Sequence, residues 1–179
     1  MAIIIDGKQI AENITEELKL EVSKMEKKPH LAVIQVGDNP ASNIYVNLKN
    51  KKAEAIGITS SIIKYPQTIT EAELIAKIEE INKDSNINAV LVQLPLPEHI
   101  NKTHIIKAIA PNKDVDGFTA QNSGDLLNGI TPMAYPCTPK GVLRLLKEYK
   151  IKISGKHAVI VGRSNIVGKP LAIMLLNEN

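Results

Sequence analysis

Ala89-Val-Leu-Val-Gln-Leu94 is the stretch of sequence that decides the fold class. It is apolar at all but one position, which predicts a strand that is buried on both of its faces. Strands of this kind belong to parallel sheets that helices cover on both sides. Two earlier stretches, Leu31 to Val36 and the pair Ile62 and Ile63, predict two further strands.

Helical patterns separate these strands. Apolar residues recur at spacings of three and four from Ile10 to Met25, which is typical of an amphipathic helix. Ser42 can begin a second helix, and Thr70-Glu-Ala-Glu73 resembles a capping box that opens a third. The predicted helices cover Gly7 to Glu26, Ser42 to Gly57, Thr70 to Lys83, and residues 98–110. Strands that alternate with helices predict an α/β fold with a parallel sheet.

The rest of the chain predicts the beginning of a second domain. Residues 111–139 are rich in Pro, Gly and Asn and are expected to be irregular, and Thr138-Pro139 is expected to start a helix through Tyr149. Lys156 to Val161 then predicts a fourth strand. Only the first βα unit of a doubly wound sheet fits after residue 150. We therefore expect a complete domain over residues 1–139, and over residues 140–179 a linker helix and an incomplete Rossmann-like domain.

Composition narrows the class of function. The chain has 179 residues with 44% hydrophobic, 23% charged and only 3% aromatic residues, and a net charge of +3. Few aromatics and dispersed lysines argue against a nucleic-acid partner. The single Cys137 excludes an internal disulfide, and the four scattered histidines predict no metal site. The sequence shows no signal peptide and no apolar run of the ~18–20 residues that span a bilayer, so we expect a cytoplasmic protein without a membrane partner.

Ser42-Asn-Ile-Tyr-Val-Asn-Leu-Lys-Asn-Lys51 carries the clearest chemical signal. Tyr45 and Lys49 are one helical turn apart, so they project from the same face. By spacing alone, a surface lysine and a half-buried tyrosine remain the simpler interpretation. A lysine works as a base only where burial or a neighbouring group lowers its pKa. Gln93, at the end of a buried strand, is placed to hydrogen-bond such an amine, and strand ends of parallel sheets are where ligands bind.

A glycine segment follows the predicted fourth strand. Gly162-Arg-Ser-Asn-Ile-Val-Gly168 departs from the Gly-x-Gly-x-x-Gly dinucleotide fingerprint, because Ser164 replaces the second glycine and the last glycine comes later. The pattern alone is therefore a weak signal. Its position between a strand and a helix is nevertheless suited to phosphate, which the N–H groups at a helix start can bind.

These segments resemble the bifunctional methylenetetrahydrofolate dehydrogenase/cyclohydrolase family. The resemblance covers essentially the whole chain, with four motifs in the family's order. They are the Tyr45 and Lys49 segment, Leu91-Val-Gln-Leu-Pro-Leu-Pro97, Lys113-Asp-Val-Asp-Gly-Phe118, and Gly162-Arg-Ser-Asn-Ile-Val-Gly-Lys-Pro170.

The resemblance implies a role for each site residue. Lys49 would be the general acid/base, Gln93 its partner, and Tyr45 a ring that stacks on the folate. Asp116 would accept two parallel N–H bonds from the pterin, although an Asp before Gly is by itself a common turn residue. NADP would be bound by a second set of residues. That set is Gly162, Arg163, Ser164 and Gly168, with Arg163 at the 2′-phosphate.

The resemblance implies oxidation of 5,10-methylenetetrahydrofolate by NADP, hydrolysis of the product to 10-formyltetrahydrofolate, and a homodimer. Two alternatives remain at this point. One is a nucleotide-dependent oxidoreductase with another substrate, and the other is a non-catalytic folate-binding fragment. Hydrolysis of methenyltetrahydrofolate without nucleotide would distinguish the folate enzyme from both alternatives, because only the folate enzyme would turn this substrate over.

Overall fold

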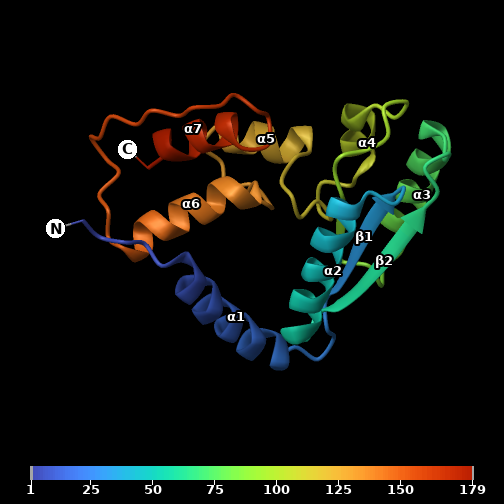
Figure 1. Ribbon diagram of the computed structural model, residues 1–179, viewed down its shortest axis with the longest axis horizontal. Helices are drawn as coiled ribbons and strands as arrows, with labels where there is room; N and C mark the ends of the chain where they lie inside the picture. The colour runs from blue at the N-terminus through green and yellow to red at the C-terminus, as the bar shows by residue number, and fades with distance from the viewer. Residues whose placement is uncertain (1, 179) are drawn as a thin grey trace. The chain divides into compact units, whose positions relative to one another are not determined.

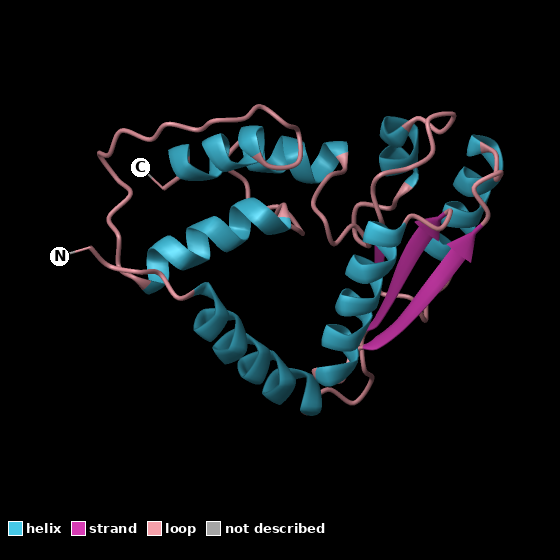
Figure 2. Ribbon diagram, viewed as in Figure 1, coloured by secondary structure: helices cyan, strands magenta, loops and turns pink. Residues whose placement is uncertain are grey.

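The computed structural model describes residues 2–178, which form seven helices and three strands (Figures 1 and 2). In chain order they are α1 (Gly7–Ser23), β1 (His30–Val36), α2 (Pro40–Ala55), β2 (Thr59–Tyr65), α3 (Glu71–Lys83), β3 (Ala89–Val92), α4 (Lys102–Ala108), α5 (Ala120–Leu127), α6 (Cys137–Glu148) and α7 (Gly168–Leu176).

The chain divides into two compact units. Residues 16–115 form the first, which we call the sheet unit. The second, the helical unit, comprises the described residues up to 15 and those from 116 onward. These boundaries do not coincide with the predicted division after residue 139. That division separates a folate-binding domain from a nucleotide-binding one, and it stays a prediction.

The sheet unit contains a three-stranded parallel sheet in the order β2-β1-β3. Strand β1 pairs with β2 from His30 opposite Thr59 onward, and with β3 from Leu31 opposite Ala89 onward. The predicted α/β class with a parallel sheet is therefore confirmed.

Helices cover both faces of this sheet. On one face, side chains of β1 and β3 pack against α3 and α4; on the other, they pack against α2. The fully buried members on the first face include Ile34, Leu74, Ile78 and Ile105. Each contributes about 1.5–3 kcal/mol relative to an exposed position. Such two-sided burial explains why β3 is apolar at consecutive positions.

The predicted capping box at the start of α3 is confirmed. The Thr70 hydroxyl accepts a hydrogen bond from the backbone N–H of Glu73 at 3.3 Å, and the Glu73 carboxylate accepts one from the Thr70 N–H at 2.9 Å. Two N–H groups that lack partners within the helix are thereby satisfied.

The predicted start of α2 at Ser42 is wrong. The helix begins at Pro40, and the side chain of Asn39 caps it by accepting from the Ser42 N–H at 3.1 Å. Proline suits the first helical position because its missing N–H would have no partner there. Ser42 therefore lies inside the first turn, where it is buried.

The helical unit contains α5, α6 and α7, which pack through Leu126, Leu143 and Met174. Helix α5 lies within residues 111–139, so the prediction that this whole stretch is irregular is wrong. Thr119 caps the helix by accepting a hydrogen bond from the Asn122 N–H. Its sequence has Asn, Ser and Gly, which favour helices weakly, so packing through Leu126 supplies the stability.

Two further predictions in this unit need correction. Helix α6 begins at Cys137, ahead of the predicted Thr138-Pro139, and Pro136 precedes it without a side-chain cap. Lys156 to Val161 does not form the predicted strand. A strand needs a neighbour for its N–H and C=O groups, and no strand among residues 2–178 pairs with this segment. Val161 is accordingly fully exposed.

Candidate functional site

Lys49 and Gln93 meet in the sheet unit. The Lys49 Nζ donates a hydrogen bond to the Gln93 Oε1 at 3.1 Å, and both side chains are partly buried. Gln93 is held in turn, because its Nε2 donates to the carbonyl of Leu94 at 2.6 Å. The amide oxygen is therefore fixed toward the lysine rather than free to rotate.

The packing of α2 explains how Lys49 reaches this position. Val46, which is 1% exposed, packs against Val33 of β1 and Leu91 of β3. Lys49 follows Val46 by three residues and so lies on the same helix face, one turn nearer the helix end. Gln93 follows Leu91 by two residues and lies on the same face of the sheet. Packing of the apolar residues thus aligns the two polar ones.

Tyr45 lies one turn before Lys49 on α2. Its side chain is 61% exposed. An aromatic ring that is held on a helix and open to solvent can stack on a flat ligand. Because Tyr45 and Lys49 are four residues apart on α2, they share a helix face, as the sequence predicts.

Gln35 is a candidate site residue that the sequence analysis missed. It lies two residues after Val33 and is 1% exposed, on the sheet face that α2 covers. Its Nε2 donates to the Asn43 Oδ1 at 2.6 Å, whereas its Oε1 has no hydrogen-bond partner among residues 2–178. A buried acceptor without a partner is unusual and requires an explanation. The signal in the sequence was one polar residue inside the apolar run Leu31 to Val36.

Lys113 and Asp114 have structural roles in the sheet unit. The buried Lys113 Nζ donates to the carbonyls of Ile81 at 2.9 Å and Asp84 at 2.7 Å, where α3 ends. The charge also suits the negative end of the helix dipole. Asp114 is buried and forms a parallel bridge with Val90 of β3. Lys113 and Asp114 thus anchor the chain just before Asp116, the predicted pterin-binding acid.

Asp116 is half-buried and belongs to the helical unit. The next residue, Gly117, has a φ of +68°. A Cβ atom there would lie 2.8 Å from the carbonyl carbon of Tyr135 and 2.9 Å from the nitrogen of Pro136. The loop therefore requires glycine both for its backbone angle and for the close approach of another backbone segment.

The glycine segment forms a compact loop before α7. The Ser164 Oγ accepts hydrogen bonds from the N–H groups of Val167 at 3.1 Å and Gly168 at 3.3 Å. A Cβ on Gly168 would lie 2.6 Å from the carbonyl carbon of Gly162, so only glycine fits this position. The exposed Arg163 lies in the same loop. The Ser164 hydroxyl oxygen thus accepts hydrogen bonds from two N–H groups at the start of α7, and the start of a helix is also where an anion can bind.

The predicted site residues are divided between the two units. Tyr45, Lys49 and Gln93 form one group on the sheet unit. Asp116 and the loop of residues 162–168 are parts of the helical unit.

Residues 2–178 contain neither a cluster of metal-binding side chains nor a helix that could span a membrane. Within that range, no group of three or more His, Cys, Asp or Glu side chains could hold a metal ion. None of the helices found there combines the length and the apolar character that crossing a membrane requires.

Two family models match the chain. Residues 5–116 match the model described as "Tetrahydrofolate dehydrogenase/cyclohydrolase, catalytic domain". Residues 136–179 match "Tetrahydrofolate dehydrogenase/cyclohydrolase, NAD(P)-binding domain". The matches follow each other in the same order as the predicted motifs.

Individual proteins agree with these matches. The chain is 51% identical to the "Bifunctional protein FolD" of Wolbachia sp. subsp. Drosophila simulans, over all of this chain and 63% of that protein's length. It is 47% identical to the FolD enzyme of Campylobacter jejuni, whose crystal structure superposes with a TM-score of 0.95 over 98% of this chain and 64% of that one. A Trypanosoma brucei FolD structure "complexed with NADP cofactor and inhibitor" is 35% identical, with a TM-score of 0.95 over 99% of this chain and 62% of that one.

The chain thus spans slightly less than two thirds of the length of the relatives that it matches. The catalytic-domain model alone covers more than half of the chain. The resemblance that the motifs predicted is confirmed, and the chain belongs to the tetrahydrofolate dehydrogenase/cyclohydrolase family.

Proposed function

We propose that this chain carries the folate site of an NADP-dependent 5,10-methylenetetrahydrofolate dehydrogenase that is also a methenyltetrahydrofolate cyclohydrolase. The observation that carries the proposal is the hydrogen bond between Lys49 and Gln93 in a chain that matches the family's catalytic domain. An amine held by an amide oxygen at the end of a parallel strand is placed to exchange protons with a bound ligand.

Each residue then has a defined task in the hydrolysis. Lys49 takes and returns protons as water adds to the methenyl carbon and the ring opens to the 10-formyl product. Gln93 orients the lysine amine through the bond of 3.1 Å. Tyr45 stacks on the folate, which its exposed ring supports. Asp116 accepts two N–H bonds from the pterin edge, a geometry that a carboxylate suits.

We assign the nucleotide to the loop before α7. The chain's residues fit such a group, because two N–H groups at the start of α7 converge on one oxygen, that of the Ser164 hydroxyl, and because residue 168 must be glycine. Gly162, Ser164 and Gly168 would lie against the phosphates, and the Arg163 guanidinium would pair with the 2′-phosphate. NADP, when bound, supplies the hydride acceptor for the oxidation.

The proposal also covers organisation and location. We propose that residues 1–139 provide folate binding and catalysis, and that residues 140–179 are a linker helix and a part of the dinucleotide-binding domain. We further propose a homodimer in the cytoplasm, which rests on the family resemblance. Light scattering would then give twice the chain's 19.5 kDa.

A nucleotide-free assay tests the central assignment. The 179-residue chain should hydrolyse 5,10-methenyltetrahydrofolate, and Lys49→Met should lower the rate by ~10²–10⁴ because a general acid/base is lost. Lys52→Met is the matched control, since this lysine is exposed on the same helix. It should hydrolyse at the rate of the unmodified chain.

Three results would count against the proposal. A Lys49→Met chain with a near-normal rate would remove the lysine from the mechanism. An inactive chain that still binds a folate analogue would favour the non-catalytic alternative. A chain that binds nucleotide but neither binds nor hydrolyses the folate would favour an oxidoreductase with another substrate.

A further inference from the structure

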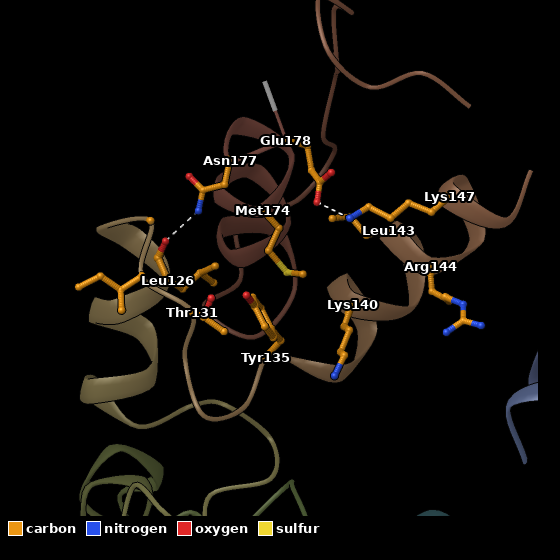
Figure 3. Close-up of a pocket in the computed structure, with 12 residues that line it drawn as sticks. Leu126, Thr131, Tyr135, Lys140, Leu143, Arg144, Lys147, Met174, Asn177 and Glu178 are labelled. Carbon is orange, nitrogen blue, oxygen red and sulfur yellow. Dashed lines mark hydrogen bonds and ion pairs between the residues drawn. The ribbon is translucent and has the colours of Figure 1, made fainter. Parts of the chain in front are cut away.

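A cavity of about 410 Å³ lies within the helical unit, among α5, α6 and α7 (Figure 3). Its volume falls within the range of small-molecule sites in proteins. It is separate from the residues to which we assign folate and nucleotide, since Tyr45, Lys49, Gln93, Asp116 and the loop of residues 162–168 do not line it. The cavity is therefore not accounted for by the proposed reaction.

One wall of the cavity is apolar. Each of the three helices contributes one buried side chain, namely Leu126 from α5, Leu143 from α6 and Met174 from α7. Methionine is flexible and polarizable, so it adapts to ligands of different shape. This wall suits the apolar body of a small ligand.

The positive charges of the cavity come from one face of α6. Lys140, Arg144 and Lys147 recur there at spacings of four and three residues, and all three line the cavity (Figure 3). Arg144 is paired with Glu148 at 2.5 Å, and Lys147 with Glu178 at 2.6 Å. Two of the three cations thus already have carboxylate partners within the protein.

Lys140 differs from the other two cations. It is in no ion pair among residues 2–178, and its Nζ lies 5.8 Å from the centroid of the Tyr135 ring, which also lines the cavity. An ammonium over an aromatic ring keeps its charge available for an anion. The cavity therefore offers one uncompensated cation beside an apolar wall, and this favours a ligand with a single negative charge.

We propose that this cavity binds a small monocarboxylate with an apolar body, such as an aromatic acid. The carboxylate pairs with the Lys140 ammonium, and the apolar body lies against Leu126, Leu143 and Met174. A dianion such as inorganic phosphate is disfavoured, because it has no apolar body and the remaining cations are already paired.

Benzoate and benzamide are matched probes, since they share a ring and nearly a shape and differ in charge. Each is titrated into the isotope-labelled 179-residue chain and followed by the shifts of backbone amide signals. Benzoate should cause saturable shifts at the residues that line the cavity. Benzamide should bind there about tenfold or more weaker, because it lacks the charged contact.

Variants then test the assigned cation. Lys140→Met should weaken benzoate binding about tenfold or more and leave benzamide binding unchanged. Lys19→Met removes one positive charge from an exposed position on α1 and should leave both probes unaffected. The amide spectra of the variants without probe show directly whether each variant is folded.

Several outcomes would overturn the proposal. Benzamide that binds as tightly as benzoate would exclude an anion site. Unchanged benzoate binding by a folded Lys140→Met chain would exclude this lysine, and phosphate that binds at the same amides with equal affinity would exclude an amphipathic ligand. An absence of saturable shifts at the cavity would exclude the site itself.

Discussion

Replacing Gly117 by alanine tests the loop that follows the proposed pterin-binding Asp116. Gly117 has a φ of +68°, and a Cβ would meet backbone atoms of residues 134–136 at distances below 3.0 Å. These are backbone atoms rather than the ends of flexible side chains, so two segments must move apart. We expect Gly117→Ala to lower the free energy of unfolding and to disturb Asp116.

A second glycine of the same unit separates the two causes of this loss. Gly129 has a nearly equal φ of +71°, but a Cβ there would meet no atom within 4 Å. Both substitutions cost about 1–2 kcal/mol for placing an L-residue in the left-handed region. Both also gain the same small term from the stiffer unfolded chain. Only Gly117→Ala adds crowding, at about 1–3 kcal/mol. The difference between the two variants should therefore be about 1–3 kcal/mol, since the shared contributions cancel.

Urea denaturation followed by circular dichroism measures this difference. The free energies of unfolding of the two variants are compared with that of the unmodified chain. Equal losses in the two variants, within about 0.5 kcal/mol, would refute the reasoning, because they would show that the 134–136 segment yields without cost. A larger loss in Gly129→Ala would refute it as well.

Three other predictions follow from the structure. Lys113→Met should lower the free energy of unfolding by about 2–3 kcal/mol in urea denaturation, because two carbonyls lose a charged donor. The exposed Lys83→Met, near the same helix end, should stay within about 0.5 kcal/mol. Hydrogen bonds, of which the one from His104 has the largest effect, hold the pKa of Glu71 below its ordinary value of 4.5. The stability advantage of the unmodified chain over Glu71→Gln should therefore be present above pH 4.5 and be lost as the pH falls through the lower folded pKa, as denaturation at several pH values would measure. Asp116→Ala should weaken binding of a folate analogue by about 1.5–3 kcal/mol and NADP binding by less, and equal folate affinity by titration would return this residue to a turn role.

Local patterns predicted α1 and most of the sheet unit. The apolar spacing of α1, the capping box at Thr70 and the apolar run of β3 each depend on residues that are close in sequence, so the sequence alone displays them. The start of α2 was also readable, because Asn39 and Pro40 form a cap and a first helical residue. Placing the start at Ser42 instead misplaced it by two residues.

Features that depend on distant residues could not be predicted in the same way. Helix α5 has weak intrinsic helix formers, and its Leu126 is buried by side chains of α6 and α7. Lys156 to Val161 has the apolar pattern of a strand, but pairing with another strand decides whether a strand forms. The sequence pattern contains no information about that partner.

The pairing of Lys49 with Gln93 shows how local and distant information combine at the proposed site. The sequence places Lys49 three residues after Val46, and this spacing determines that the two share a helix face. The strand order β2-β1-β3 then places Leu91 of β3 beside Val33 of β1, so that Val46 packs against both. Because Gln93 follows Leu91 by two residues, the same packing that buries Val46 brings the lysine to the amide oxygen. A substitution that shifts this packing, such as Val46→Phe, should therefore separate Lys49 from Gln93 although it changes neither residue. Loss of hydrolysis with retained folate-analogue binding would support this dependence, and unchanged hydrolysis by a folded Val46→Phe chain would show that the lysine is positioned by other means.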